Sequence, residues 1–384
     1  MRAGASLLLL LAALVVSSCG ASHRTDASHR IVKTRSAPSE PKNYRFALIS
    51  RSGAVRKVSD LPVGSAVADG RGGWFVAGDF GLARLLPDGK LDSAWGTSAS
   101  RNLVGCHGQL VKSGSRLYIP GSQPDAAAAA VGERGPCGIE AFDAGTGARL
   151  WVSPSFAQTQ NPIYALTASP TRVYVGGVFI KVGSAKRQGL AALDAKTGRL
   201  LAWRSPPLRS GTKGSPNITA LTLAGSRLYI GGPFDSIAGK RRQYLAALSP
   251  STGALLPWKP PQAVYGAYIP DEILVTRGQL LVSGEDAFAA VNLRSGRAPS
   301  WPSRIRGRAT RFTANGPLLY LGANIEHSID AVDGARRNNL AVFNLATKRF
   351  TGWAPDLAPY TDVGEIVPSG RQVLVVGSFT DSIG

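Results

Sequence analysis

Histidine and cysteine are scarce in this chain of 384 residues, which has four His and three Cys. His23 and His29 lie in a polar N-terminal stretch, which leaves His107 and His327 in the rest of the chain. No Cys and His spacing fits a zinc site. No Gly-x-Ser-x-Gly motif stands between a strand and a helix, where a nucleophile would be expected. The sequence therefore singles out no catalytic residue.

Acidic residues are also few, since 24 Asp and Glu stand against 44 Lys and Arg, and the formal net charge is +20. Such an excess favours attraction to anionic lipid head groups or acidic wall polymers. The alternative is an Arg-rich composition with no functional meaning. No acidic cluster has the pattern of a calcium-binding loop, so we predict no bound metal.

The chain has no apolar run long enough to cross a bilayer, which takes about 20 residues. The run "LLLLLAALVV", from Leu7 to Val16, fits the core of a secretory signal instead. The following "VSSC" resembles the bacterial lipobox. This resemblance implies cleavage before Cys19 and a lipid on its sulfur. An ordinary signal peptide with a chance Cys is the alternative.

Three segments follow from these features. We expect a signal peptide at 1–18, a flexible Ser- and Pro-containing tether at 19–44, and a folded body at 45–384. The body would be anchored by lipid to the outer face of the cell membrane. An exported protein of this kind is not expected to bind nucleic acid. It does meet an oxidising environment, so Cys106 and Cys137 are predicted to form a disulfide.

Tryptophan marks an internal repeat of about 50 residues. Each of six Trp ends a stretch that reads as strand, tight turn and strand, such as "LAALDAKTGRLLAW". We predict that these side chains pack in the core between neighbouring sheets. The six are Trp95, Trp151, Trp203, Trp258, Trp301 and Trp353.

A second signature, an apolar run closed by Gly such as "RVYVGG", precedes each Trp hairpin and is itself preceded by a short apolar segment. The unit therefore predicts a blade of four antiparallel strands, and the fold class is an all-β, seven-bladed β-propeller. The last Gly-ended run, at 372–379, has no hairpin after it, but "FALISRSGAV" at 46–55 supplies one. We predict that these terminal segments share one blade and close the ring. The alternative is a fragment of a longer array.

The motif Ala-x-Asp-x-x-Thr-Gly-x-x-x-Trp at 141–151 resembles the tryptophan-docking motif of the pyrroloquinoline-quinone-like (PQQ-like) propeller superfamily. "VAGDF" with "LARLLPDGKLDSAW" resembles a related family of bacterial propeller repeats. Quinoprotein dehydrogenases of the superfamily use PQQ and calcium, usually eight blades, a catalytic Asp and often a disulfide between adjacent cysteines. This chain has seven repeats, distant cysteines and no calcium loop, so we predict no cofactor.

The short apolar segment before each Gly-ended run is the expected inner strand of its blade. The residues at the start of these inner strands would line the mouth of a propeller channel. They form a mixed polar rim that could bind a polar ligand or a partner's loop, or be solvated loop ends. Arg304, Arg306 and Arg308 alternate, so in a strand they would share a face that could bind an anion. The rim candidates are Asn161, Asn217, Asp271, Arg308 and Asp362.

The sequence thus predicts a lipid-anchored, extracytoplasmic propeller that binds or scaffolds a protein partner or an anionic wall polymer. A PQQ-dependent dehydrogenase is the alternative. A lyase or hydrolase that uses rim residues is a third hypothesis.

Overall fold

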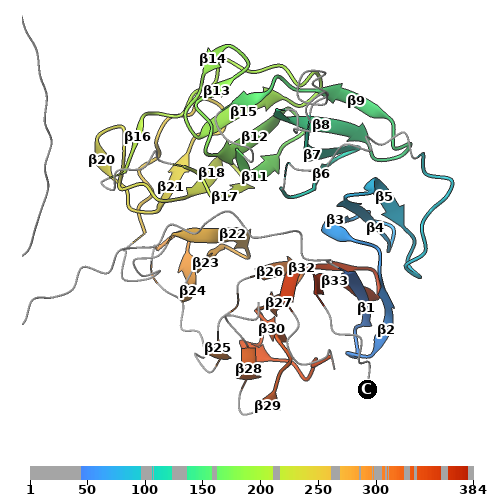
Figure 1. The fold of residues 1–384 in the computed structure, drawn as a ribbon. Helices are drawn as coiled ribbons and strands as arrows, with labels where there is room; N and C mark the ends of the chain where they lie inside the picture. The colour runs from blue at the N-terminus through green and yellow to red at the C-terminus, as the bar shows by residue number, and fades with distance from the viewer. Residues whose placement is uncertain are drawn as a thin grey trace, which may run out of the picture. The chain divides into compact units, whose positions relative to one another are not determined.

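A computed structural model describes residues 45–96, 106, 108–122, 136–157, 162–210, 217–260, 269–284, 287–295, 297, 305–307, 309, 311–323, 329–332, 335–355 and 362–378. All of its regular secondary structure in these ranges is strand, and the named strands pair antiparallel (Figure 1). The all-β prediction is therefore confirmed. None of the described residues forms a helix of the length and hydrophobicity needed to cross a bilayer.

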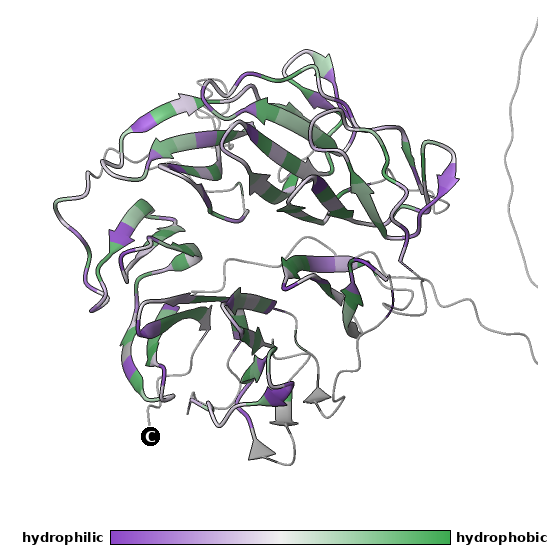
Figure 2. Cartoon of the chain, turned by 180° about the vertical axis from the view of Figure 1, so that it is seen from behind, coloured by the Kyte–Doolittle hydropathy of each residue, from purple (hydrophilic) through white to green (hydrophobic). Residues whose placement is uncertain are grey.

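The repeating unit is a sheet of three strands: an inner strand, a central strand that ends at a small residue, and a third strand. The central strands are buried on both faces, which explains their continuous apolar runs (Figure 2). In chain order the trios are β3 (Val63–Ala68), β4 (Trp74–Gly78), β5 (Gly81–Leu85); β6 (Val111–Ser113), β7 (Arg116–Ser122), β8 (Cys137–Asp143); β11 (Ile163–Ala168), β12 (Arg172–Gly177), β15 (Leu190–Asp194); β17 (Ala220–Ala224), β18 (Arg227–Gly231), β21 (Leu245–Leu248); β22 (Pro270–Thr276), β23 (Gln279–Gly284), β24 (Ala287–Asn292); β26 (Arg311–Asn315), β27 (Leu318–Gly322), β30 (Leu340–Asn344); and β32 (Asp362–Ser369), β33 (Gln372–Ser378), β1 (Arg45–Ser50).

A fourth strand is less regular than the sequence predicts. Three sheets have one, namely β2 (Val55–Ser59), β9 (Arg149–Val152) and β31 (Arg349–Phe350). In three others the fourth strand shrinks to a single bridge, as between Leu193 and Leu200. The prediction of four full strands in every blade is wrong there.

Short additional strands, which the sequence analysis did not predict, lie beside three of the described repeats. A hairpin follows the central strand and pairs with a short strand from the preceding repeat. Buried Arg187 and Arg242 directly follow two of these hairpins and donate to the backbone oxygens of Leu201 and Arg241. One group continues the β6-β7-β8 sheet, because Phe156 pairs with Cys137, and the other two are separate sheets. The groups are β10 (Phe156–Ala157), β13 (Lys181–Val182), β14 (Ala185–Lys186); β16 (Leu208–Arg209), β19 (Ser236–Ile237), β20 (Lys240–Arg241); and β25 (Ile305–Gly307), β28 (Ile329–Val332), β29 (Ala335–Arg336).

The two ends of the described body meet in one sheet, ordered β2-β1-β33-β32. Strand β1 pairs with β33 from Arg45 opposite Gly377 to Ser50 opposite Gln372. The pairing of terminal segments that the sequence predicts is therefore present. We call this sheet the terminal sheet.

Hydrophobic clusters lie between sheets that follow one another along the chain. Phe75 and Trp95 of the β3-β4-β5 sheet pack with Leu117 and Phe142 of the next. The terminal sheet joins both of its neighbours in the same way. Its own members of these clusters are Ala47, Ile49, Val373 and Val375 towards the β26-β27-β30-β31 sheet, and Phe46, Leu48, Leu374 and Val376 towards the β3-β4-β5 sheet.

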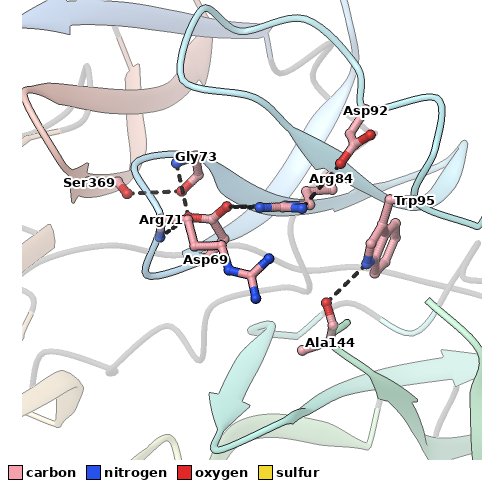
Figure 3. Close-up of polar contacts among 8 residues, drawn as sticks. All are labelled: Asp69, Arg71, Gly73, Arg84, Asp92, Trp95, Ala144 and Ser369. Atoms are coloured by element: carbon pink, nitrogen blue, oxygen red, sulfur yellow. Dashed lines mark hydrogen bonds and ion pairs between the residues drawn. The ribbon is translucent and has the colours of Figure 1, made fainter. Parts of the chain in front are cut away.

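Four of the docking Trp donate a hydrogen bond to a carbonyl in the outer turn of the next sheet. Trp95 Nε1 lies 3.0 Å from Ala144 O, and Trp151 Nε1 lies 3.2 Å from Ala195 O (Figure 3 shows the first). Trp203 and Trp353 make the same contact with Ser249 O and Ser50 O. Trp258 is partly buried and its Nε1 has no partner among the described residues, while Trp301 lies outside them.

The turn that receives the ring explains the Asp-x-x-Thr-Gly motif. The Asp143 carboxylate accepts hydrogen bonds from the Thr146 and Gly145 amides and from the Thr146 hydroxyl, which lower the pKa of Asp143. Gly147 follows with φ +76°, and a Cβ there would come within 3.2 Å of Trp95 Cε2. Glycine is therefore required for two reasons, its positive φ and the ring that lies against it.

Gly198→Ala should destabilise the protein more than Gly239→Ala. Both glycines have a similar positive φ, +71° and +73°, but a Cβ at Gly198 would overlap Trp151 and one at Gly239 would meet nothing within 4 Å. Chemical denaturation should show a loss of about 1 kcal/mol for Gly239→Ala and about 3 kcal/mol for Gly198→Ala. Equal losses would contradict the docking role of Trp151.

Candidate binding site on the inner strands

Four of the inner strands share a bulge near their start. The register shifts between Val63 and Ser65 in β3, and the same shift occurs in β11, β22 and β32. One residue is skipped each time, which bends the strand locally. We call the place of the residue after the bulge, and the corresponding place in the other inner strands, the post-bulge position. Its occupants are Ser65, Ala165, Glu272 and Glu365, and Ala220 and Arg311 pair at the corresponding place in β17 and β26, whose described residues show no register shift.

Among the described residues, charged side chains occupy the post-bulge position in three sheets, which follow one another along the chain. Glu272, Arg311 and Glu365 are all partly buried. The Arg311 guanidinium donates to Gly364 O at 2.8 Å, which holds its charge beside the strand that bears Glu365. The arrangement is a positive charge with a carboxylate on the strand to either side.

The two carboxylates also link neighbouring sheets. Glu365 Oε2 accepts from Ala66 N at 2.6 Å, and Glu272 Oε2 accepts from Phe312 N at 3.2 Å. Ser65 extends this contact, because its hydroxyl donates to Glu365 Oε1 while its oxygen accepts from Leu110 N, both at 2.8 Å. A chain of hydrogen bonds therefore runs from Glu365 through Ser65 to the following sheet.

Burial raises the pKa of both carboxyls from 4.5 to about 7. Hydrogen bonds and the charge of Arg311 oppose the rise in each case. The nearby carboxylates Glu365 and Asp271 add to the rise at Glu272. The site can therefore take up or release protons near neutral pH.

Three of the predicted rim residues lie in the described part of the chain, each at or just before the start of a different inner strand. Asp271 is exposed at the bulge of β22, Asp362 is buried at the start of β32, and Asn217 is partly buried with an Oδ1 that has no described partner. Asn161 and Arg308 lie outside the described residues. The sequence analysis chose residues that open the strands, and it missed the charged residues that follow the bulge.

The other predicted sites fall partly outside the structure. Cys106 and Cys137 form a disulfide with Cα atoms 5.7 Å apart, and both are buried. It links the segment before β6 to the first residue of β8. Arg306 lies in β25, whereas Arg304 lies outside the described residues, so the anion-binding stripe stays a prediction. Cys19 and the tether also lie outside them.

A second charged cluster lies on the β3-β4-β5 sheet (Figure 3). Asp69 accepts from the amides of Arg71 and Gly73 and pairs with Arg84 at 2.7 Å. Burial raises the pKa of Asp69, but these hydrogen bonds and the charge of Arg84 outweigh it, so the pKa is lowered overall. Arg84 also pairs with Asp92 at 3.2 Å. Because these charges are matched with one another, the cluster stabilises the turn rather than offering a site.

No three His, Cys, Asp or Glu side chains gather as metal ligands in the ranges that the structure describes. The ligand set for calcium that a PQQ enzyme requires is thus not found among these residues. We derive no step through that cofactor, and its role stays a hypothesis.

A family model of PQQ-like repeats, described as outer membrane protein assembly factor BamB, matches residues 139–350. The chain belongs to this family. The match runs from β8 to β31 and covers more than half of the sequence. Membership in the BamB family confirms the resemblance to PQQ-like propeller repeats that the Trp motifs indicate. No curated protein matches the chain.

The chain is similar to solved structures at low identity, and one of them has a TM-score above 0.5. The computationally designed protein Ika8 is similar over 85% of this chain and 87% of its own, with 11% identity and a TM-score of 0.52. BamB from Moraxella catarrhalis is similar over 86% of this chain and 98% of its own, with 15% identity and a TM-score of 0.44. An extracellular domain of a hybrid two component system from B. thetaiotaomicron covers 82% of this chain, which spans 39% of that protein, at 13% identity and a TM-score of 0.46.

Glu365→Gln should stabilise the protein at pH 8 and have little effect at pH 4. Because the folded-state pKa of Glu365 is raised, protonation favours the folded state below pH 4.5, and this contribution is lost as pH rises through about 7. Glutamine mimics the protonated form at every pH. The gain in the free energy of unfolding at pH 8 should be on the order of 1–3 kcal/mol by urea denaturation.

The control is Asp79→Asn, which removes an exposed carboxylate between β4 and β5 and should shift stability little at either pH. A Glu365→Gln protein that is less stable than the wild type at pH 8 would show that the carboxylate is needed in its charged form.

Proposed function

We propose that this chain is a seven-bladed β-propeller of the cell envelope that acts as a scaffold by docking a protein partner. Membership in a family described as an outer membrane protein assembly factor supports an envelope location and a binding role. The likeness to a designed protein at a TM-score of 0.52 over 85% of this chain supports one continuous fold across most of the chain.

The hydrophobic clusters support closure of the ring. In the described residues each cluster takes its members from two sheets that are consecutive along the chain. The terminal sheet packs on the β26-β27-β30-β31 sheet through one cluster and on the β3-β4-β5 sheet through another. A cyclic order of seven blades satisfies all of these contacts.

The observation that carries the docking proposal is an exposed apolar pair at one end of the β11-β12-β15 sheet. Tyr164 is 42% exposed at the bulge of β11, and Ile180 is 39% exposed just after β12. The pairing of β11 with β12 places both residues at the same end of the sheet. A partly exposed Tyr beside an apolar side chain is a typical anchor in protein interfaces.

Positive charge borders this apolar pair. Lys181 and Lys186 are exposed on the β13-β14 hairpin, and Lys240 and Arg241 are exposed on the β19-β20 hairpin. A partner with an apolar centre and an acidic rim would complement this surface. The opposite end of the sheet instead carries the short turn at Thr171 and the turn at Lys196.

Site-specific photo-cross-linking in cells tests the scaffold proposal. A photoreactive residue in place of Tyr164 should cross-link one envelope protein, and the same residue in place of exposed Thr171 should not. Tyr164→Ala with Ile180→Ala should then reduce co-purification of that protein by at least about tenfold. Equal cross-linking from both positions, or none from Tyr164, would contradict docking at this end.

Two other outcomes would point elsewhere. Cross-links from Tyr164 to wall polymer alone would favour polymer binding over a protein partner. A rise in the melting midpoint with PQQ and calcium would point to the dehydrogenase, since a ligand of the folded state raises stability.

We also propose that a lipid on Cys19 anchors the protein to the membrane. The run "LLLLLAALVV" followed by "VSSC" supports this. Wild-type protein should sediment with membranes and be released by detergent, whereas Cys19→Ser should lose most of this association. Cys137→Ser keeps Cys19 and serves as the control. Membrane association that is unchanged in Cys19→Ser would overturn the anchor.

A further inference from the structure

The terminal sheet lacks the aromatic pair that five of the other sheets have. Five sheets place a Trp against an aromatic residue of their central strand, as Tyr118 does with Trp151 at 5.7 Å between ring centroids. Tyr118 lies three residues before the central glycine Gly121. The corresponding residue of the terminal sheet is Leu374, and its fourth strand, "VRKVS", contains no Trp.

A cavity of about 760 Å³ lies at this sheet and reaches Leu48, the register partner of Leu374. Its other walls come from the β1–β2 turn, the β32–β33 turn and the Asp88 turn of the next sheet. The cavity thus lies at the position where five other sheets have an indole ring and the terminal sheet has none.

Three arginines line the cavity. Arg51 lies in the β1–β2 turn, Arg56 lies in β2, and Arg371 lies in the β32–β33 turn. The only acidic side chain in its lining is Asp88, whose charge is offset by Lys90 at 3.4 Å. The cavity therefore has a net positive charge, and guanidinium groups bind phosphate through paired hydrogen bonds.

The turns that carry these groups are held in place. Arg51 Nη2 donates to Gly370 O at 2.7 Å, which ties the two turns together. Ser50 O accepts from Trp353 of the preceding sheet, and Ser50 Oγ bonds Ser52 Oγ at 2.8 Å. These turns are already ordered before a ligand binds, which favours binding.

Neutral polar groups complete the lining. The Ser50 and Ser52 hydroxyls border the cavity, and so does Gln372, whose Oε1 is buried with no partner among the described residues. We propose that this cavity binds a phosphate group, with Arg51, Arg56 and Arg371 as its charged ligands. This role is independent of protein docking, because the cavity belongs to the terminal sheet and the docking end to the β11-β12-β15 sheet.

Calorimetric titration of the full-length protein with inorganic phosphate, at constant ionic strength, tests the proposal. The wild type should bind one phosphate saturably. Arg56→Gln with Arg371→Gln should weaken binding by at least about tenfold, because two charge-assisted contacts are lost. Both residues are exposed, and the melting midpoint without phosphate should be unchanged.

The matched control is Arg199→Gln with Arg294→Gln, which removes the same charge from exposed turns outside the cavity. Its affinity for phosphate should stay within about twofold of the wild type. An equal loss in both double variants, or no saturable binding by the wild type, would overturn the proposal. Arg371→Gln alone should give an intermediate affinity, which separates loss of a ligand from loss of fold.

A second titration identifies the source of the phosphate. Glycerophosphoglycerol carries the phosphodiester of a lipid head group without its acyl chains. Tighter binding of this diester than of inorganic phosphate would assign the cavity to a lipid head group. The reverse order would assign it to a free phosphate.

Discussion

An indole ring that lies against a neighbour's turn is the contact on which the described sheets depend. A three-stranded sheet cannot bury both of its faces by itself, so its stability comes from the sheets beside it. The Trp makes that contact directional, because its ring requires a glycine and its Nε1 requires a carbonyl in the next sheet. The hydrogen bond from Trp151 to Ala195 and the close approach of Gly198 meet both requirements at once. The sheets are therefore joined in a fixed order along the chain.

On the inner strands, the post-bulge position contributes to packing in some sheets and to electrostatic contacts in others. Ala165 and Ala220 leave the post-bulge position apolar, whereas Glu272, Arg311 and Glu365 make it charged. Carboxylates that link sheets and also titrate near neutral pH couple the contacts between those sheets to proton concentration. The BamB-family repeat thus carries a local variation that the overall fold does not require.

Much of the fold could be predicted from the sequence because Trp, Gly and the strand patterns recur at one phase. The all-β class, the sheets and the pairing of terminal strands follow from that periodicity. The bulges could not be predicted, since one skipped residue leaves no mark in an apolar pattern, and so Glu272 and Glu365 were missed in favour of residues that open the strands. The hairpin of Lys240 and Arg241 was missed because a basic run of this kind is also typical of a solvated loop. A cavity that arises from the lack of a Trp can be recognised only when the terminal sheet is compared with the other sheets.

The terminal sheet has a consequence for the order of assembly. Arg51 and Gly370 bond across 319 residues of sequence, so β1 is made long before its partner β33 exists. Until then β1 has β2 on one side and an open backbone edge on the other, which is a template for pairing with foreign strands. Contacts of such long range form slowly, because a large loop must close first. Strand β1 is therefore exposed to aggregation until β33 pairs with its open edge.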